Sequence, residues 1–221
     1  MRWRASGWRC TPTATRPACT TRCWTNSRRG PPRRRRPLPR PRRRYLRAAA
    51  LRSYNLNDAG TELPAFLRTD PLGRELPFLP DLAGLERALT RAFHAADAAP
   101  LTAAHLAALA PESFLAGRVR FQPSVAVCAS PWPIHALWLA RETPHGEIDV
   151  DLTAGEQVIV WRADLHVDCQ PIAREPAAAL QALLAGATVV EVAERHDDLT
   201  AVVAWLADCI GRGLVVACAV V

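Results

Sequence analysis

The sequence predicts an α+β protein, in which a helical N-terminal part is followed by a smaller mixed α/β domain with a winged-helix-like order of elements. Apolar residues recur at three- and four-residue steps between residues 82 and 109. Two segments after residue 155 alternate between apolar and polar side chains, and three short helical segments then lead into an apolar strand. We divide the chain into an Arg/Pro-rich head, a helical domain, a strand with connector, and the winged-helix-like domain: 1–52, 53–117, 118–150 and 151–221.

The head differs from the rest of the chain in charge. The first 57 residues contain seventeen arginines and no Asp or Glu, whereas the remainder holds eleven arginines and twenty-one acidic residues. The net charge of +7 is therefore the sum of a positively charged head and a negatively charged body. Clustered cations release counterions from phosphate backbones, so this composition suits a nucleic-acid-binding arm. We expect residues 1 to about 45 to be disordered, because like charges without counter-charges do not fold.

The head also has the composition of a GC-rich gene translated out of frame. It combines arginine and proline with tryptophan and cysteine, and it contains no lysine. When the codons of Trp8 to Arg28 are regrouped one nucleotide earlier, Trp24-Thr25 becomes Leu-Asp. The neighbouring positions then allow an amphipathic, charge-balanced helix, whereas the given frame has no hydrophobic period. Two interpretations of residues 1–52 stay open, a genuine basic arm and a shifted reading frame.

Residues 54–116 are predicted to be mostly helical. After a turn, a short helix runs from Glu62 to Arg68. Asp81 is a suitable N-cap for a longer helix, whose apolar residues share one face: Leu82, Leu85, Leu89 and Phe93. Thr102 is expected to cap the next helix, and Pro111 to open a last short one.

The middle segment, 118–141, is expected to begin as a single strand. Its apolar residues are Val119, Phe121, Val125 and Val127. The strand should end in a turn at 130–133 and be followed by a short helix through Trp138, with a surface loop at 144–146.

The last seventy residues predict a hairpin, three helices and a returning strand. The hairpin joins 156–161 to 165–170, and its second strand alternates between a buried and a wet face. In the first helix Leu180, Leu183 and Leu184 should point inward, and Gly186 should end it. Thr188 with Glu191 fits a capping box at the second helix. The remaining predicted elements are the helix 198–210 and the strand 214–220.

No motif in the sequence indicates catalysis or a cofactor. There is no Gly-rich phosphate loop, nucleophile elbow, HExxH motif or Cys/His quartet. We therefore predict a protein without catalytic residues, metal or cofactor. Two alternatives use histidines: a metal site from His94, Asp97 and His105, and an acid–base pair of His166 with Asp168.

The cysteines and the hydropathy of the chain indicate in which cellular compartment the protein is expected. The body has four cysteines in apolar stretches without CxxC spacing, which is typical of reduced, buried thiols in a cytoplasmic protein: Cys128, Cys169, Cys209 and Cys218. No run of eighteen apolar residues occurs, so no membrane-spanning helix is predicted.

Several motifs of the body resemble one bacterial family. Residues 54–60 read Tyr-Asn-Leu-Asn-Asp-Ala-Gly, residues 62–67 read Glu-Leu-Pro-Ala-Phe-Leu, and residues 75–83 read Glu-Leu-Pro-Phe-Leu-Pro-Asp-Leu-Ala. Residues 85–97 and the Ser-Pro-Trp-Pro motif at 130–133 continue the match. Over residues 53 to 221 the chain is similar to the HvfC/BufC-like family of DNA-binding-domain proteins, which are partner proteins of methanobactin-type peptide-modifying enzymes.

This resemblance implies an accessory protein with a helical N-terminal domain described as DNA-binding and a mixed α/β C-terminal domain. Several members are thought to partner an iron-dependent oxidative enzyme that modifies a ribosomally made peptide. The family's opening Tyr-x-Asn-x-Tyr pattern is absent from residues 1–52. The regrouped reading of residues 8–28 restores a pattern close to it.

The C-terminal pattern from Leu180 to Leu214 is also similar to peptide-recognition winged helices of the pyrroloquinoline-quinone-chaperone type. There, an extended leader peptide adds as a strand to a sheet edge and lies against the third helix. The resemblance implies that the edge near residues 158–162 supplies main-chain bonds, with the 199–210 helix lining the groove. The implied binding residues are Val158, Val160, Trp161 and Arg162, and Trp161 is the expected exposed anchor.

Three functions are compatible with these features. The first is a non-catalytic recognition protein that presents a precursor peptide to an oxidative enzyme. The second is a DNA-binding regulator, although an acidic body repels phosphates unless a local basic stripe exists. The third is a metal-dependent enzyme built on His94, Asp97 and His105. The missing catalytic motifs and the hairpin–helix unit favour the first.

Overall fold

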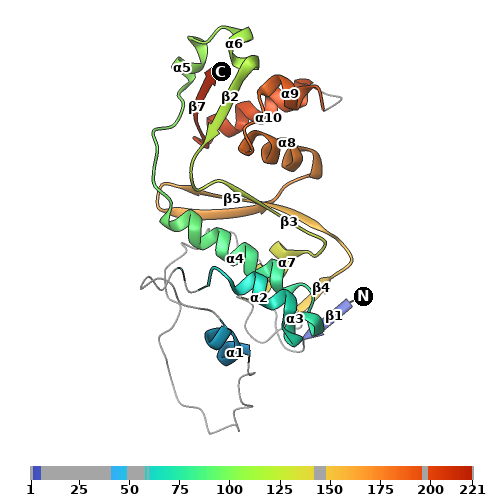
Figure 1. Cartoon of the computed structure of the whole chain (residues 1–221). Helices are drawn as coiled ribbons and strands as arrows, with labels where there is room; N and C mark the ends of the chain where they lie inside the picture. Colours follow the sequence, from blue (N-terminus) through green and yellow to red (C-terminus); the bar gives the residue numbers. More distant parts are fainter. Residues whose placement is uncertain are drawn as a thin grey trace, which may run out of the picture.

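The computed structural model describes residues 2–5, 41–48, 58, 60–141, 148–195 and 199–220. A run of helices is followed by antiparallel strands and further helices along these ranges, which confirms the α+β class. Figure 1 shows the strands β3 and β5 across the middle of the chain, with α4 on one side and α8 on the other. Among the described helices, none has both the length and the apolar composition needed to cross a membrane.

Residues 60–116 are mostly helical, as predicted, and a further helix precedes them. The helices are α1 (Pro41–Ala48), α2 (Leu63–Thr69), α3 (Pro71–Glu75), α4 (Leu79–His94), α5 (Ala103–Ala107) and α6 (Pro111–Ala116). The predicted cap at Thr102 is confirmed, because its side chain accepts a hydrogen bond from the His105 backbone N–H. The predicted cap at Asp81 is wrong. Helix α4 begins earlier, with Pro80 in its first turn, and Asp81 accepts a hydrogen bond from the Ser130 hydroxyl at 2.9 Å instead.

Seven strands form three antiparallel sheets within the described ranges. They are β1 (Arg2–Ala5), β2 (Gly117–Phe121), β3 (Ala126–Ser130), β4 (Ile148–Asp151), β5 (Glu156–Ala163), β6 (His166–Pro171) and β7 (Val215–Val220). The sheets are β1-β4, β2-β7 and β3-β5-β6. The single strand expected from residue 118 is therefore two strands in different sheets. The extended backbone is interrupted between the two strands by a turn at residues 122–125, in which the Val125 N–H donates to the Gln122 carbonyl.

The hairpin and the C-terminal helices largely follow the prediction. The turn between β5 and β6 places Asp164 at φ +54°, a left-handed conformation that Asp tolerates. The helices are α7 (Ile134–Ala140), α8 (Arg174–Leu184), α9 (Val189–Ala193) and α10 (Leu199–Gly211). The capping box of Thr188 and Glu191 is confirmed. Leu184 is an exception, because its side chain is exposed instead of pointing inward.

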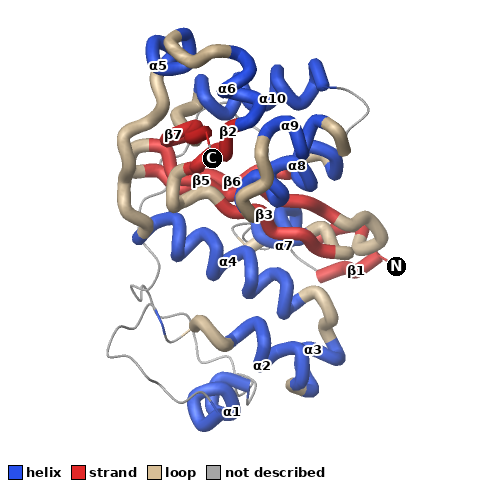
Figure 2. The backbone as a smooth tube through the Cα atoms, turned by 45° about the horizontal axis from the view of Figure 1, so that its top comes forward, coloured by secondary structure: helices blue, strands red, loops and turns tan. Residues whose placement is uncertain are grey.

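Strand β5 separates two apolar cores. Ile159 and Trp161 face the larger one, which joins β2, β7 and the C-terminal helices. Val158 and Val160 face the other, which contains Leu85 of α4 and residues of α7. Figure 2 shows α4 along one side of this sheet and α8 on the other. This alternation follows from the two-residue period of a strand that is covered on both faces.

The strand pairing changes the predicted domain organisation. Strand β7 pairs with β2, and β3 pairs with β5, so two strands that precede residue 150 belong to the same sheets and cores as elements that follow it. The expected boundary at residue 150 therefore does not separate two packing units. The returning strand also joins β2 instead of the hairpin, which differs from the predicted closing of the winged-helix-like unit.

Part of the head packs on the body. In α1, the Arg44 guanidinium donates to both carboxylate oxygens of Asp70 at 2.7 and 2.8 Å, and the Tyr45 ring lies edge-on to Phe66. Asp70 also caps α3 by accepting from the Leu72 backbone N–H. The hydrogen bonds from Arg44 hold the pKa of Asp70 below its usual value. The expected boundary at residue 52 therefore falls after a helix that belongs to the body. The disorder expected for residues 1 to about 45 is wrong for residues 2–5, which form β1 and pair with β4, and for residues 41–45, which lie in α1; residues 1 and 6–40 lie outside the described residues.

Candidate peptide-binding edge

The structure places the predicted binding residues on an inner strand. Strand β5 pairs with β3 on one side and with β6 on the other, so its backbone offers no free edge. Val158 and Val160 are fully buried, and Trp161 is 8% exposed with the Arg212 guanidinium over its ring. The expectation of an edge at Val158 to Arg162, with Trp161 as an exposed anchor, is wrong. The exposed apolar residue of the hairpin is Leu165 at its tip.

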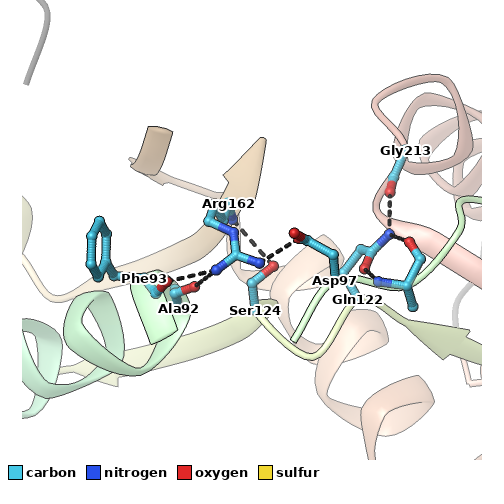
Figure 3. A network of polar contacts seen from close by, with 8 residues as sticks. Ala92, Phe93, Asp97, Gln122, Ser124, Arg162 and Gly213 are labelled. Carbon is cyan, nitrogen blue, oxygen red and sulfur yellow. Dashed lines mark hydrogen bonds and ion pairs between the residues drawn. The ribbon is translucent and has the colours of Figure 1, made fainter. Parts of the chain in front are cut away.

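Arg162 has a structural task at the end of α4. Its guanidinium is only 10% exposed and donates to the Phe93 carbonyl at 2.6 Å, to the Ala92 carbonyl and to the Asp97 carboxylate. Its backbone N–H donates to the Ser124 hydroxyl. Because the carbonyls at a helix C-terminus carry partial negative charge, a buried guanidinium is well matched there. Figure 3 shows this network together with Gln122, whose side-chain NH₂ group donates to the carbonyls of Ala98 and Gly213.

The free edge of the three-stranded sheet lies on β6. In an antiparallel ladder, residues alternate between bonding one neighbour and pointing their N–H and C=O groups to the other side. The Ile172 N–H donates to the Gln157 carbonyl at 2.8 Å. Together with the register of the hairpin, this bond determines which residues of β6 direct their backbone groups toward β5. By this alternation, the backbone groups of Val167 and Cys169 point away from β5. No described strand pairs with that side of β6.

Pro171 marks the same edge in the sequence. It lies opposite Val158, at a position whose N–H would point away from β5. Proline has no N–H, so within sheets it is confined to edge strands and strand ends. This signal was present in the sequence, directly after the alternating segment 165–170, and it indicates that the second strand of the hairpin is the outer one.

The two faces of β6 differ in chemistry. Val167 and Cys169 are half-buried and pack against the core formed with α4 and α7. His166, Asp168 and Gln170 are exposed and lie on the other face, next to the buried row of β5. A segment added beside β6 would therefore meet an apolar shelf on one face and a polar row on the other.

Helix α7 ends near this shelf. The Arg141 guanidinium lies 3.3 Å from the centroid of the Trp138 ring and donates to the Trp138 carbonyl at 2.7 Å. Arg141 is also close enough to Cys169 to lower the pKa of its thiol, although burial is the larger effect and raises that pKa to about 11. Leu139 on the same helix is 49% exposed. Trp138 packs with Val167 and Cys169, so the end of α7 contributes an aromatic side chain beside β6.

Strand β3 is the other outer strand of the sheet and is less suited to addition. Val127 packs against the larger core, whereas Ala126 and Cys128 pack against the smaller one. Both faces of β3 are thus covered by packed elements, and a segment beside it would have to displace them. Within the three-stranded sheet, β6 combines an unpaired edge with one open face.

A second feature is a cavity of about 340 Å³ on the outer side of α4. Arg87, Arg91 and His94 line it at spacings of four and three residues, with Thr90 between them. Asp58 contributes one carboxylate to the same cavity. This is a local basic stripe on an otherwise acidic body.

The structure does not assemble the metal site considered from His94, Asp97 and His105. Within the described residues, no three His, Cys, Asp or Glu side chains are placed to hold a metal together. Asp97 instead pairs with Arg162, and the His105 ring contacts the Thr102 hydroxyl at 2.9 Å. His166 and Asp168 share the exposed face of β6.

The four body cysteines are free thiols. Cys209 is buried, and the other three are half-buried. Burial raises the pKa of Cys128 and Cys169 to about 11 and that of Cys209 to about 12. Thiols with raised pKa values are poor nucleophiles at neutral pH.

Comparisons with known proteins give the chain no relatives: no family model matches it, and neither does any curated protein.

Proposed function

We propose that this protein is a non-catalytic recognition protein that binds an extended peptide by strand addition to β6. The observation that carries the proposal is the unpaired outer side of β6, where the backbone groups of Val167 and Cys169 face outward. An extended peptide gains affinity from such main-chain bonds and specificity from its alternating side chains. In this respect β6 replaces the edge that the sequence had suggested near residues 158–162.

The biological setting of the proposal comes from the resemblance to the HvfC/BufC-like family. The peptide would be a precursor peptide, and the protein would present it to an iron-dependent oxidative partner enzyme. The modification chemistry would then belong to that enzyme, and this chain would supply only binding and orientation. A winged-helix-like recognition domain, built from the β3-β5-β6 sheet and α8 to α10, is part of the same proposal.

The proposal is tested by selecting peptides from a displayed library of short, proline-free segments on the full chain. Recovered peptides should protect the amides of Val167 and Cys169 from hydrogen exchange, because both N–H groups become bonded. Val167→Pro should weaken binding by about tenfold or more, since it removes one of two outward N–H groups and the ring blocks the edge.

Val167→Thr is the matched control, because it keeps the N–H and the β-branched shape. It should retain peptide binding, and both variants should keep the circular dichroism spectrum of the parent. A selection that recovers no peptide, or peptides whose binding ignores Val167→Pro, would exclude strand addition at β6.

A second candidate function is DNA binding, which the basic stripe on α4 favours. Arg87, Arg91 and His94 line one cavity, and a stripe of this kind can contact phosphates. Arg91→Glu should then weaken salt-sensitive binding of the chain to duplex DNA, whereas Arg195→Glu on the loop after α9 should not. Absence of any DNA binding at low salt would reject this candidate.

A further inference from the structure

We infer that the segment added to β6 carries a lysine or arginine opposite Asp168 and small or branched apolar residues on its other face. This inference rests on the proposed function, and it names the chemistry of the peptide. It follows from how the two faces of β6 are placed relative to the buried sheet.

The position of Asp168 in the new ladder is set by the hairpin. Asp168 lies opposite Trp161, and its own N–H and C=O are directed toward β5 by the alternation that Ile172 and Gln157 establish. In an antiparallel segment beside β6, Asp168 would therefore occupy a non-hydrogen-bonded pair. Such pairs have the shorter Cα separation, about 4.5 Å, and bring facing side chains closest together.

The Asp168 carboxylate is accessible to a positively charged side chain of an added strand. Asp168 is exposed, and its flanking residues on the same face, His166 and Gln170, carry no full negative charge that would compete. No ion pair or hydrogen bond of the Asp168 side chain occurs among the described residues. Opposite charges directly across a ladder stabilise it, and like charges destabilise it. A cation opposite Asp168 is thus favoured, and a carboxylate there is disfavoured.

The other face requires apolar side chains. Val167 and Cys169 are half-buried against the core that includes Trp138, so their outer flanks continue an apolar surface. Side chains that alternate with the basic residue would lie beside this surface. The occupant is therefore an amphipathic strand, basic on its open face and apolar on its covered face.

The test uses the peptide recovered by selection on the full chain, resynthesised with Lys, Gln or Glu at each polar position in turn. At one position the affinity should follow Lys > Gln > Glu, with about fivefold between Lys and Gln. Asp168→Lys in the protein should reverse this order. Glu194→Lys, which makes the same charge change at the end of α9, should leave the order unchanged.

The outcomes separate the inference from the proposed function. If peptide binding depends on the Val167 N–H but shows no charge preference that Asp168→Lys reverses, strand addition stands and the basic partner is excluded. A reversal that Glu194→Lys also produces would mean a response to net charge, which likewise overturns the inference. If no peptide is recovered, both the function and the inference fail. Asp168→Asn is a second variant, and it should reduce the Lys preference without reversing it.

Discussion

Strands β5 and β6 belong to one hairpin, yet they have different surroundings. Every residue of β5 from Val158 to Trp161 is buried, whereas β6 alternates between half-buried and exposed positions. The difference arises because β5 has a partner strand on each side and a core on each face, while β6 lies at the margin of the sheet. Within one hairpin, the inner strand is therefore part of the core, whereas the outer strand keeps unpaired backbone groups on one side.

The largest effect should come from placing a charge on the inner strand. Val160→Asp would bury an unpaired carboxylate between α4 and the sheet, and it should lower the free energy of unfolding by more than about 4 kcal/mol. Gln170→Asp on the exposed face of β6 should change it by less than about 0.5 kcal/mol. Urea denaturation followed by circular dichroism measures both. Equal losses for the two variants would contradict the assignment of inner and outer strands.

A smaller effect is expected from Arg162, which joins the inner strand to α4. Arg162→Gln removes the guanidinium bonds to the Ala92 and Phe93 carbonyls and should cost about 2–3 kcal/mol in thermal or urea denaturation. Asp97→Asn should cost less than about 1 kcal/mol, because the Asp97 side chain is 85% exposed and its ion pair is screened. If Asp97→Asn proved as costly as Arg162→Gln, the ion pair would be the main contribution instead of the capped carbonyls.

The mildest effect concerns the thiols on either side of β5. The folded-state pKa values of Cys128 and Cys169 are raised to about 11, so the folded protein keeps protons that the unfolded chain releases above a pKa of about 8.5. This stabilisation is complete below that pH and is lost as the pH rises toward 11. The free energy of unfolding should therefore fall between pH 9 and 11. Cys169→Ala should flatten this decrease, and an unchanged slope would show that Cys169 is not shielded in the folded protein.

Local features of this protein could be predicted from sequence because they depend on neighbouring residues. The cap at Thr102, the capping box at Thr188 and the hairpin turn each involve groups a few residues apart, whose geometry local chemistry decides. The helix break at Gly186, at φ +92°, belongs to the same class. The sequence also predicts the long helix, but it places the N-cap at Asp81. Aspartate is a common N-cap residue, and the sequence does not show that this side chain instead accepts a hydrogen bond from the distant Ser130.

The candidate site could be predicted only in part. The sequence shows the alternation of 165–170, and Pro171 indicates an outer strand, but the edge was expected on the preceding strand. Periodicity cannot state which neighbour pairs with which strand, so the partner of β5 on its far side, β3, was not foreseen. The burial of Trp161 and the use of Arg162 as a cap for α4 both follow from that unforeseen contact.

Side-chain patterns along the chain are enough to predict the α+β class, the order of most helices and strands, and the alternating faces of the hairpin. These properties depend on side-chain size, polarity and spacing along the chain, which are local quantities. Three properties depend on long-range packing: β7 pairs with β2, β3 pairs with the far side of β5, and the outer side of β6 has no strand partner among the described residues. Pairings between residues far apart in sequence depend on which apolar faces can be buried together, and that is a property of the whole chain.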